Sequence, residues 1–255
     1  MARYSANLGF LWTELSLVEG VRAAKKAGFD AVECHWPYAT PAAELGAVLK
    51  ETGLPMLGLN TVRGDAGKGE FGLAALEGRE REAIAAIEQA IDYAAAAGVP
   101  NVHVMAGKKG RPETFLVNLA HAADRAAPLG IDVLIEPINQ RDAPGYTVSL
   151  VEEAAHLIDE LGRSNVKIMF DCYHTQIMQG DLIRRIEKHL PLIGHIQIAA
   201  APSRREPDEG EVALDRVCRA IDELGWQGWI GAEYRPRGTT EEGLGWLGAF
   251  RAAGA

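Results

Sequence analysis

Eight short apolar runs alternate with longer helical runs along the chain, and this alternation constrains the fold more than any other feature. The candidate strands are Tyr4–Leu8, Ala31–Cys34, Met56–Asn60, Val102–Met105, Val133–Glu136, Lys167–Phe170, His195–Ile198 and Gly231–Glu233, the last of which starts nearer Gly228. Consecutive apolar residues are typical of parallel strands that are buried on both faces. Eight strand–helix repeats of about 32 residues each suit one closed barrel. We therefore expect an α/β fold, a single (β/α)₈ barrel domain over residues 1–255.

Local signals agree with this reading. The segments Ser16–Glu19, Ser149–Glu152 and Thr239–Glu242 fit the capping box, in which two side chains satisfy free backbone donors at a helix start. The rival fold is an open, doubly wound sheet, but no Gly-x-Gly-x-x-Gly follows the first strand. The long polar stretch Thr61–Arg79 follows the third strand, so it is expected on the face of the barrel that carries the active site, as a candidate lid.

Composition narrows the class of protein. The net charge is −9, so the chain has no overall attraction for nucleic acid or for an anionic membrane, and neither is expected as a partner. No apolar run approaches the ~18 residues of a membrane span, and the start MARYSANLGFLW does not resemble a signal peptide. Three cysteines, Cys34, Cys172 and Cys218, show no CxxC spacing and indicate a reducing, cytoplasmic compartment. A homo-oligomer is compatible with the sequence.

Four expected strands end in an oxygen-bearing side chain. These are Glu136 in VLIEP, Asp171 in KIMFD, Gln197 in HIQI and Glu233 in GAEY, and they are separated by 35, 26 and 36 positions. Each separation is about one β/α unit, so the four residues are expected on one rim, at the ends of strands five to eight. Converging carboxylates repel each other unless a cation lies between them, and all-oxygen ligands suit Mg²⁺ or Mn²⁺. The alternative is that each acid pairs separately with an arginine or lysine.

Several segments spread over nearly the whole chain carry a family resemblance. They are SANLGFLWTE, VECHWPY, LNTVRGDAGKGEFGLAALEGRE, LIEPIN, FDCYHTQIMQGDL, GHIQIA, REPDEGEV and WQGWIGAEYRPRGTTEEGLGWL. They resemble the hydroxypyruvate isomerases and the related 2-oxo-tetronate isomerases of the xylose-isomerase-like TIM barrel superfamily. The resemblance implies a metal-dependent aldose–ketose isomerase that interconverts hydroxypyruvate and tartronate semialdehyde, so the expected partner is a small hydroxy-carbonyl acid or sugar acid.

The resemblance also assigns roles. It implies that Glu136, Asp171, Gln197 and Glu233 bind the metal, and that Glu136 and Glu233 are also the catalytic acid/base pair. Two further residues match substrate contacts, His174 and Arg204.

One segment departs from the family pattern. Where hydroxypyruvate isomerases often read Asp-Asn-Pro-His-Arg-Gly-Glu-Pro, this chain has Ala-Ala-Pro-Ser-Arg-Arg-Glu-Pro at 200–207. The EPIN and PGY segments favour hydroxypyruvate as the substrate, whereas VHVMAG, REPDEGEV and the C-terminal run look closer to the oxo-tetronate enzymes.

The chemistry accounts for these residue types. Moving a carbonyl to its neighbouring carbon requires loss of the proton next to it, and the resulting enediolate is stabilised by a Lewis-acidic metal while carboxylates move the proton. A substrate carboxylate needs a cation, for which Arg204 is the first candidate and Arg205, Lys108 and Lys109 stand in reserve. Open alternatives are a sugar epimerase, a zinc-dependent apurinic endonuclease and a non-catalytic binding barrel.

Other candidates are weaker. His195 shares a strand face with Gln197 and is expected as a layer residue inside the barrel. His103 is open between a packing and a site role. Three aromatic residues after the first two strands are candidates for pocket walls: Trp12, Trp36 and Tyr38.

Overall fold

All eight expected strands are present in the computed structural model, which describes residues 2–253. The strands are β1 (Arg3–Asn7), β2 (Ala31–Glu33), β3 (Leu59–Asn60), β4 (Asn101–His103), β5 (Asp132–Ile135), β6 (Val166–Asp171), β7 (Ile193–Ile198) and β8 (Trp229–Ala232). β3 is shorter than predicted, because Met56 forms only an isolated parallel bridge to Val32.

The strands form one parallel sheet that closes on itself. The order is β2-β1-β8-β7-β6-β5-β4-β3, so the first and last strands of the chain are neighbours. Backbone bonds from Val32 N to Pro55 O and from Leu57 N to Val32 O join β2 to the segment before β3 and complete the barrel. All carboxyl ends of parallel strands therefore meet at one rim.

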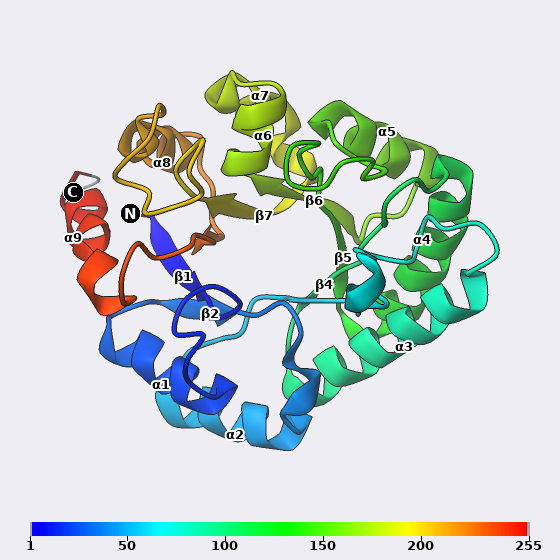
Figure 1. Cartoon of the computed structure of the whole chain (residues 1–255), viewed down its shortest axis with the longest axis horizontal. Helices are drawn as coiled ribbons and strands as arrows, with labels where there is room; N and C mark the ends of the chain where they lie inside the picture. Colours follow the sequence, from blue (N-terminus) through cyan, green and yellow to red (C-terminus); the bar gives the residue numbers. More distant parts are fainter. Residues whose placement is uncertain (1, 254–255) are drawn as a thin grey trace.

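Helices surround the strands as an outer ring (Figure 1). They are α1 (Leu17–Lys26), α2 (Ala42–Thr52), α3 (Glu80–Ala97), α4 (Pro112–Ala126), α5 (Val151–Leu161), α6 (Cys172–Met178), α7 (Leu182–His189), α8 (Leu214–Glu223) and α9 (Gly245–Ala253). Short 3₁₀ turns occur at η1 (Pro37–Ala39), η2 (Ala66–Lys68), η3 (Ala127–Leu129), η4 (Leu190–Leu192) and η5 (Glu241–Gly243). No helix within residues 2–253 has the length and apolar character that a membrane crossing requires.

Two of the three predicted capping boxes are confirmed. Ser16 and Glu19 exchange hydrogen bonds at the start of α1, and Thr239 and Glu242 do so at the start of η5. The box predicted at Ser149–Glu152 is wrong, because the Glu153 carboxylate accepts from the backbone amides of Ser149 and Leu150. The Ser149 hydroxyl instead donates to Tyr146 O.

The predicted lid segment is fastened to the barrel at its C-terminal half. Ala74 N and Ala75 N donate to the carbonyls of Met105 and Ala106 after β4. Gly72 has φ +114, and a Cβ there would lie 2.6 Å from Met105 O, so only glycine fits this close approach. The segment thereby forms part of the wall at the carboxyl ends of the strands.

Candidate active site

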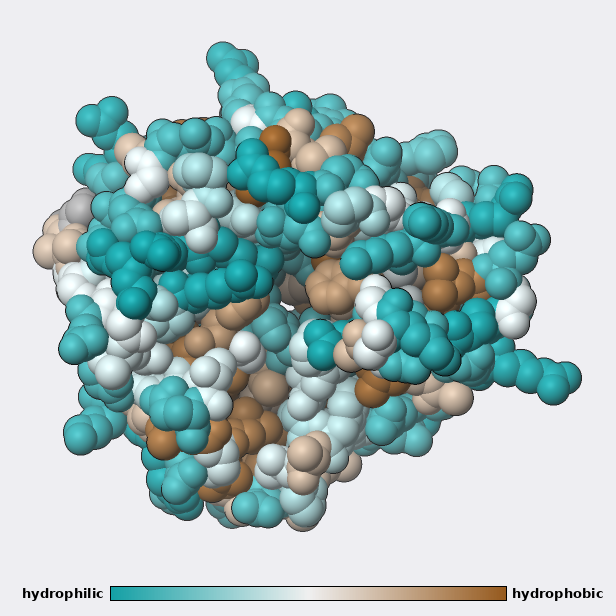
Figure 2. Space-filling model, viewed as in Figure 1, coloured by the Kyte–Doolittle hydropathy of each residue, from teal (hydrophilic) through white to brown (hydrophobic). Residues whose placement is uncertain are grey.

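A pocket of about 300 Å³ opens at the carboxyl ends of the strands. Figure 2 shows the hollow near the centre of this face, ringed by hydrophilic and hydrophobic groups. Four of the residues predicted for the site line the pocket, namely Glu136, His174, Arg204 and Glu233. Trp36, one of the three aromatic candidates for its wall, also lines it.

The remaining two predicted ligands, Asp171 and Gln197, are neighbours in the β6–β7 register. All four predicted ligands are buried: Glu136 is 6% exposed, Asp171 1%, Gln197 2% and Glu233 4%.

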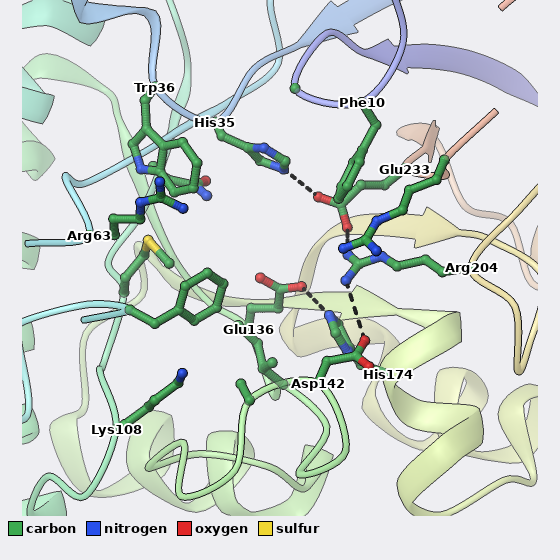
Figure 3. Close-up of a pocket in the computed structure, with 17 residues that line it drawn as sticks. Phe10, His35, Trp36, Arg63, Lys108, Glu136, Asp142, His174, Arg204 and Glu233 are labelled. Atoms are coloured by element: carbon green, nitrogen blue, oxygen red, sulfur yellow. Dashed lines mark hydrogen bonds and ion pairs between the residues drawn. The ribbon is translucent and has the colours of Figure 1, made fainter. Parts of the chain in front are cut away.

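Arg204 is the counter-charge for this acidic cluster. Its Nη2 donates to Glu233 Oε2 at 2.5 Å (Figure 3) and lies 3.7 Å from Asp171 Oδ2. Its Nη1 lies 3.8 Å from Asp142 Oδ2. The guanidinium also lies 5.0 Å from the ring centroid of Phe10 and 4.9 Å from that of Tyr173, which restricts its rotation.

Glu233 has two further partners on the opposite side from Arg204. Its Oε1 lies 2.8 Å from His35 Nε2 and accepts from Asn7 Nδ2 at 3.0 Å. Asn7 is the last residue of β1, and His35 follows the end of β2. The two residues hold the carboxylate of Glu233 in one orientation at the pocket wall.

Gln197 is oriented by a polar cluster inside the barrel. Its Nε2 donates to Glu33 Oε2 at 3.2 Å, and the same carboxylate oxygen lies 2.7 Å from His195 Nε2. Gly231 leaves room for this cluster, because a Cβ there would lie 2.1 Å from Glu33 Oε1. His195 is thus a layer residue, as expected. Since the Gln197 NH₂ group is used, its Oε1 is left for another partner.

Asn139 determines which nitrogen of His174 carries the proton. Asn139 Oδ1 accepts from Asp142 N at 2.8 Å, so its Nδ2 faces His174 Nδ1 at 2.6 Å, and Asn139 N also donates to Nδ1. An Nδ1 that accepts two bonds is unprotonated, so the neutral ring carries its proton on Nε2. That Nε2 lies 3.5 Å from Glu136 Oε1 and 3.7 Å from Asp171 Oδ2.

The buried titratable groups of the site differ in the direction in which their pKa values are shifted. Burial, then the charges of Glu233 and Asp171, raise the pKa of Glu136 well above its ordinary value. Burial also opposes ionisation of Glu233, but Arg204 and then His35 outweigh it and lower the pKa of that carboxyl. Burial, then Arg204, holds the pKa of His174 well below its usual range, so its imidazole is neutral.

His103 lies beside the same cluster. Its Nδ1 is 3.5 Å from Glu136 Oε2, and burial lowers its pKa to about 3. The side chain is buried, and within residues 2–253 neither ring nitrogen has a hydrogen-bond partner. A neutral His103 therefore packs against Glu136 without neutralising it.

The donor atoms fit a divalent cation. Ligand atoms of Glu136, Asp171 and His174 lie within 4.8 Å of one another. Among the described residues, Asp171 Oδ2 and Gln197 Oε1 are buried oxygens without a hydrogen-bond partner, an arrangement that costs about 1–3 kcal/mol per group unless another ligand satisfies it. Because His174 carries its proton on Nε2, carboxylate and amide oxygens are the better ligands, and they suit a hard ion.

Comparisons with known proteins identify the family of this chain. The family model described as "Xylose isomerase-like TIM barrel" matches residues 21–250. The chain therefore belongs to the xylose isomerase-like TIM barrel family. It is 44% identical to a 2-oxo-tetronate isomerase of Cupriavidus necator, over 97% of this chain and 98% of that protein. It is 41% identical to a putative hydroxypyruvate isomerase of Homo sapiens, over 97% of this chain and 95% of that protein.

A solved structure is also similar. It is the crystal structure of a protein named AP endonuclease, family 2, from Brucella melitensis, whose sequence is 41% identical to this chain. The two structures superpose with a TM-score of 0.94 and cover 98% of this chain and 99% of the other. The two proteins thus share one fold along nearly their whole length.

The sequence alone missed the residues that orient the site. Asn7, Glu33, His35, Asn139 and Asp142 were not predicted as site residues, although all of them contact predicted ones. Asn7 and Glu33 were detectable in principle, because each is a polar residue at the end of an apolar strand. Arg205 and Lys109, two of the reserve cations, are exposed residues that do not line the pocket.

Proposed function

We propose that this chain is a metal-dependent aldose–ketose isomerase that interconverts hydroxypyruvate and tartronate semialdehyde. The observation that carries the proposal is a pair of buried glutamates, Glu136 and Glu233, which border one pocket next to two buried oxygens that have no hydrogen-bond partner among the described residues. The names of the isomerase relatives support the same reaction class. The alternative substrate class is the 2-oxo-tetronates.

The two glutamates suit proton transfer between adjacent carbons. One must take a proton from carbon and the other must return it to the neighbouring carbon. Their environments push the pKa of Glu136 up and that of Glu233 down, as expected for an acid and base pair. Glu136, Asp171, Gln197 and Glu233 would hold the metal, and Mg²⁺ or Mn²⁺ bound there supplies Lewis-acid stabilisation of negative charge on the substrate oxygens.

His174 and Arg204 border the reacting end of the substrate in this proposal. His174 presents an N–H group at Nε2 toward the space beside Glu136, where negative charge develops on the substrate. Arg204 keeps Glu233 ionised and faces the same space. Both side chains are largely buried, so water competes weakly with their bonds to the substrate.

A product screen by NMR tests the proposed function. Protein loaded with Mg²⁺ or Mn²⁺ is expected to convert hydroxypyruvate to tartronate semialdehyde, with a 2-oxo-tetronate offered in parallel as the alternative substrate. In deuterated water the product should carry deuterium at the carbon that receives the proton. If no hydroxy-carbonyl acid is converted by protein of verified metal content, the proposal is wrong.

The Asn139→Asp variant tests the role of His174. An aspartate of the same shape accepts hydrogen bonds but does not donate them, so the proton of His174 should move to Nδ1 and leave Nε2 without its N–H. A hydrogen bond to developing charge is worth about 1.5–3 kcal/mol, so kcat should fall about tenfold to a hundredfold. Nitrogen NMR of the ring reports the tautomer, and metal content is measured as a control. A protonated Nε2 in the variant would refute the assignment.

The same metal-loaded protein can be tested for two alternative functions, sugar epimerisation and cleavage of abasic DNA. An epimerase would use both glutamates on one carbon, so it would return a sugar or sugar acid with inverted stereochemistry and an unmoved carbonyl. The name of the similar Brucella melitensis protein, AP endonuclease, motivates a test for incision of abasic DNA. We expect none, because the net charge of −9 opposes binding to nucleic acid and Gln197 replaces a histidine ligand suited to zinc.

A further inference from the structure

Three cations that line the pocket have no carboxylate partner within residues 2–253, and two of them, Arg63 and Lys108, lie on one wall. Arg63 and Lys108 are half-buried, and within residues 2–253 neither side chain forms an ion pair or a hydrogen bond. In Figure 3 they lie across the pocket from Glu233 and Arg204, with Glu136 between the two sides. One wall of the pocket thus carries the clustered acids and the other carries free positive charge.

Aromatic rings hold both cations in place. The Arg63 guanidinium lies 4.7 Å from the ring centroid of Trp36, and the Trp36 ring is itself fixed by a bond from Nε1 to Thr61 O. The Lys108 ammonium lies 5.7 Å from the ring centroid of Phe71. Such stacking lowers the conformational freedom of the side chain without using its hydrogen-bond donors, which leaves them available to a ligand.

Arg204 was expected from the sequence to bind the substrate carboxylate. It lies across the pocket from Arg63 and Lys108. It already faces the carboxylates of Glu233, Asp171 and Asp142. A substrate carboxylate beside Arg204 would also lie next to these acids and be repelled by them. Arg235 is the third cation of the pocket without a carboxylate partner among the described residues, but it is exposed and lies over Phe10, whose ring also contacts Arg204.

We propose that Arg63 and Lys108 form the subsite for the substrate carboxylate. This inference rests on the proposed function and deepens it by assigning the orientation of the substrate. With its carboxylate on Arg63 and Lys108, a 2-oxo acid points its hydroxy-carbonyl end at Glu136 and Glu233. Arg63 offers a planar fork that matches a carboxylate, and Lys108 adds a point charge.

Kinetics of single variants test the subsite. Arg63→Gln and Lys108→Gln should each raise the KM for hydroxypyruvate about tenfold to a hundredfold, since one charge-assisted hydrogen bond is lost. The kcat should stay within about threefold, because the carboxylate is held equally in the ground and transition states. Lys109→Gln is the matched control, an exposed neighbour outside the pocket that should leave both constants unchanged.

A binding measurement separates this inference from the proposed reaction. 3-Hydroxypropanoate has the carboxylate of hydroxypyruvate but no keto group, so it cannot be isomerised. 1,3-Propanediol is its neutral analogue. Saturation-transfer NMR should show that wild-type protein prefers the acid and that both variants lose this preference. If that holds while hydroxypyruvate is not converted, the reaction is wrong and the subsite stands. Unchanged KM and unchanged acid binding in both variants, or a loss confined to kcat, would overturn the subsite.

Discussion

Removal of divalent metal is expected to lower kcat of the isomerase about a thousandfold or more. A Lewis acid contributes several kcal/mol to stabilising the charge of the transition state, and each 1.36 kcal/mol is about tenfold in rate. Dialysis against a chelator should abolish turnover, and Mg²⁺ or Mn²⁺ should restore it. Full activity of protein shown to be metal-free would contradict the assignment of the site.

A stability measurement checks the same site without relying on activity. Metal at a hundredfold excess over its Kd stabilises the folded state by about 2.7 kcal/mol. For a chain of this length that corresponds to a rise in Tm of about 5–10 °C. Asp171→Asn should lose most of this rise, because it weakens one of the proposed metal ligands, which is buried. Asp181→Asn is the matched control, since Asp181 is exposed and has φ +52, a conformation that asparagine tolerates.

The barrel and its principal acids were predictable from local patterns. Each buried parallel strand shows as a short apolar run, and a carboxylate at its end, such as Glu136 or Asp171, stands out against that run. Spacing by one β/α unit then places Glu233 on the same rim. These inferences require only neighbours in sequence and the known geometry of a closed parallel barrel.

The contacts that orient those acids depend on tertiary structure. Glu33 and Gln197 are 164 positions apart, and Asn7 and Glu233 are 226 apart, so no local pattern links them. The surroundings of Arg204 could not be predicted from the sequence for the same reason. Its sequence neighbourhood indicates a free cation in a loop, but the fold surrounds its guanidinium with three carboxylates and two aromatic rings.

Replacing either of the two glutamates proposed to be catalytic is expected to lower kcat by at least about 10²–10⁴-fold, the usual contribution of general acid–base catalysis. Glu136→Gln and Glu233→Gln keep the shape and one coordinating oxygen but remove the group that exchanges protons near neutral pH. Bound metal must be measured in both variants, since metal loss would also abolish turnover. Glu187→Gln, an exposed change on α7, is the matched control with native kcat expected.

Solvent exchange in deuterated water then assigns the two roles. The variant that lacks only the returning group should still exchange the hydrogen on the carbon beside the carbonyl, but it should form no product. The variant that lacks the group taking the first proton should do neither. Arg204 and then His35 keep Glu233 ionised against burial, whereas burial favours the protonated form of Glu136, so Glu233 is the carboxylate available to take the first proton and Glu136→Gln should be the variant that retains exchange. Exchange retained in Glu233→Gln alone would reverse the order. Near-native isomerisation by either variant with metal bound would remove that residue from the reaction.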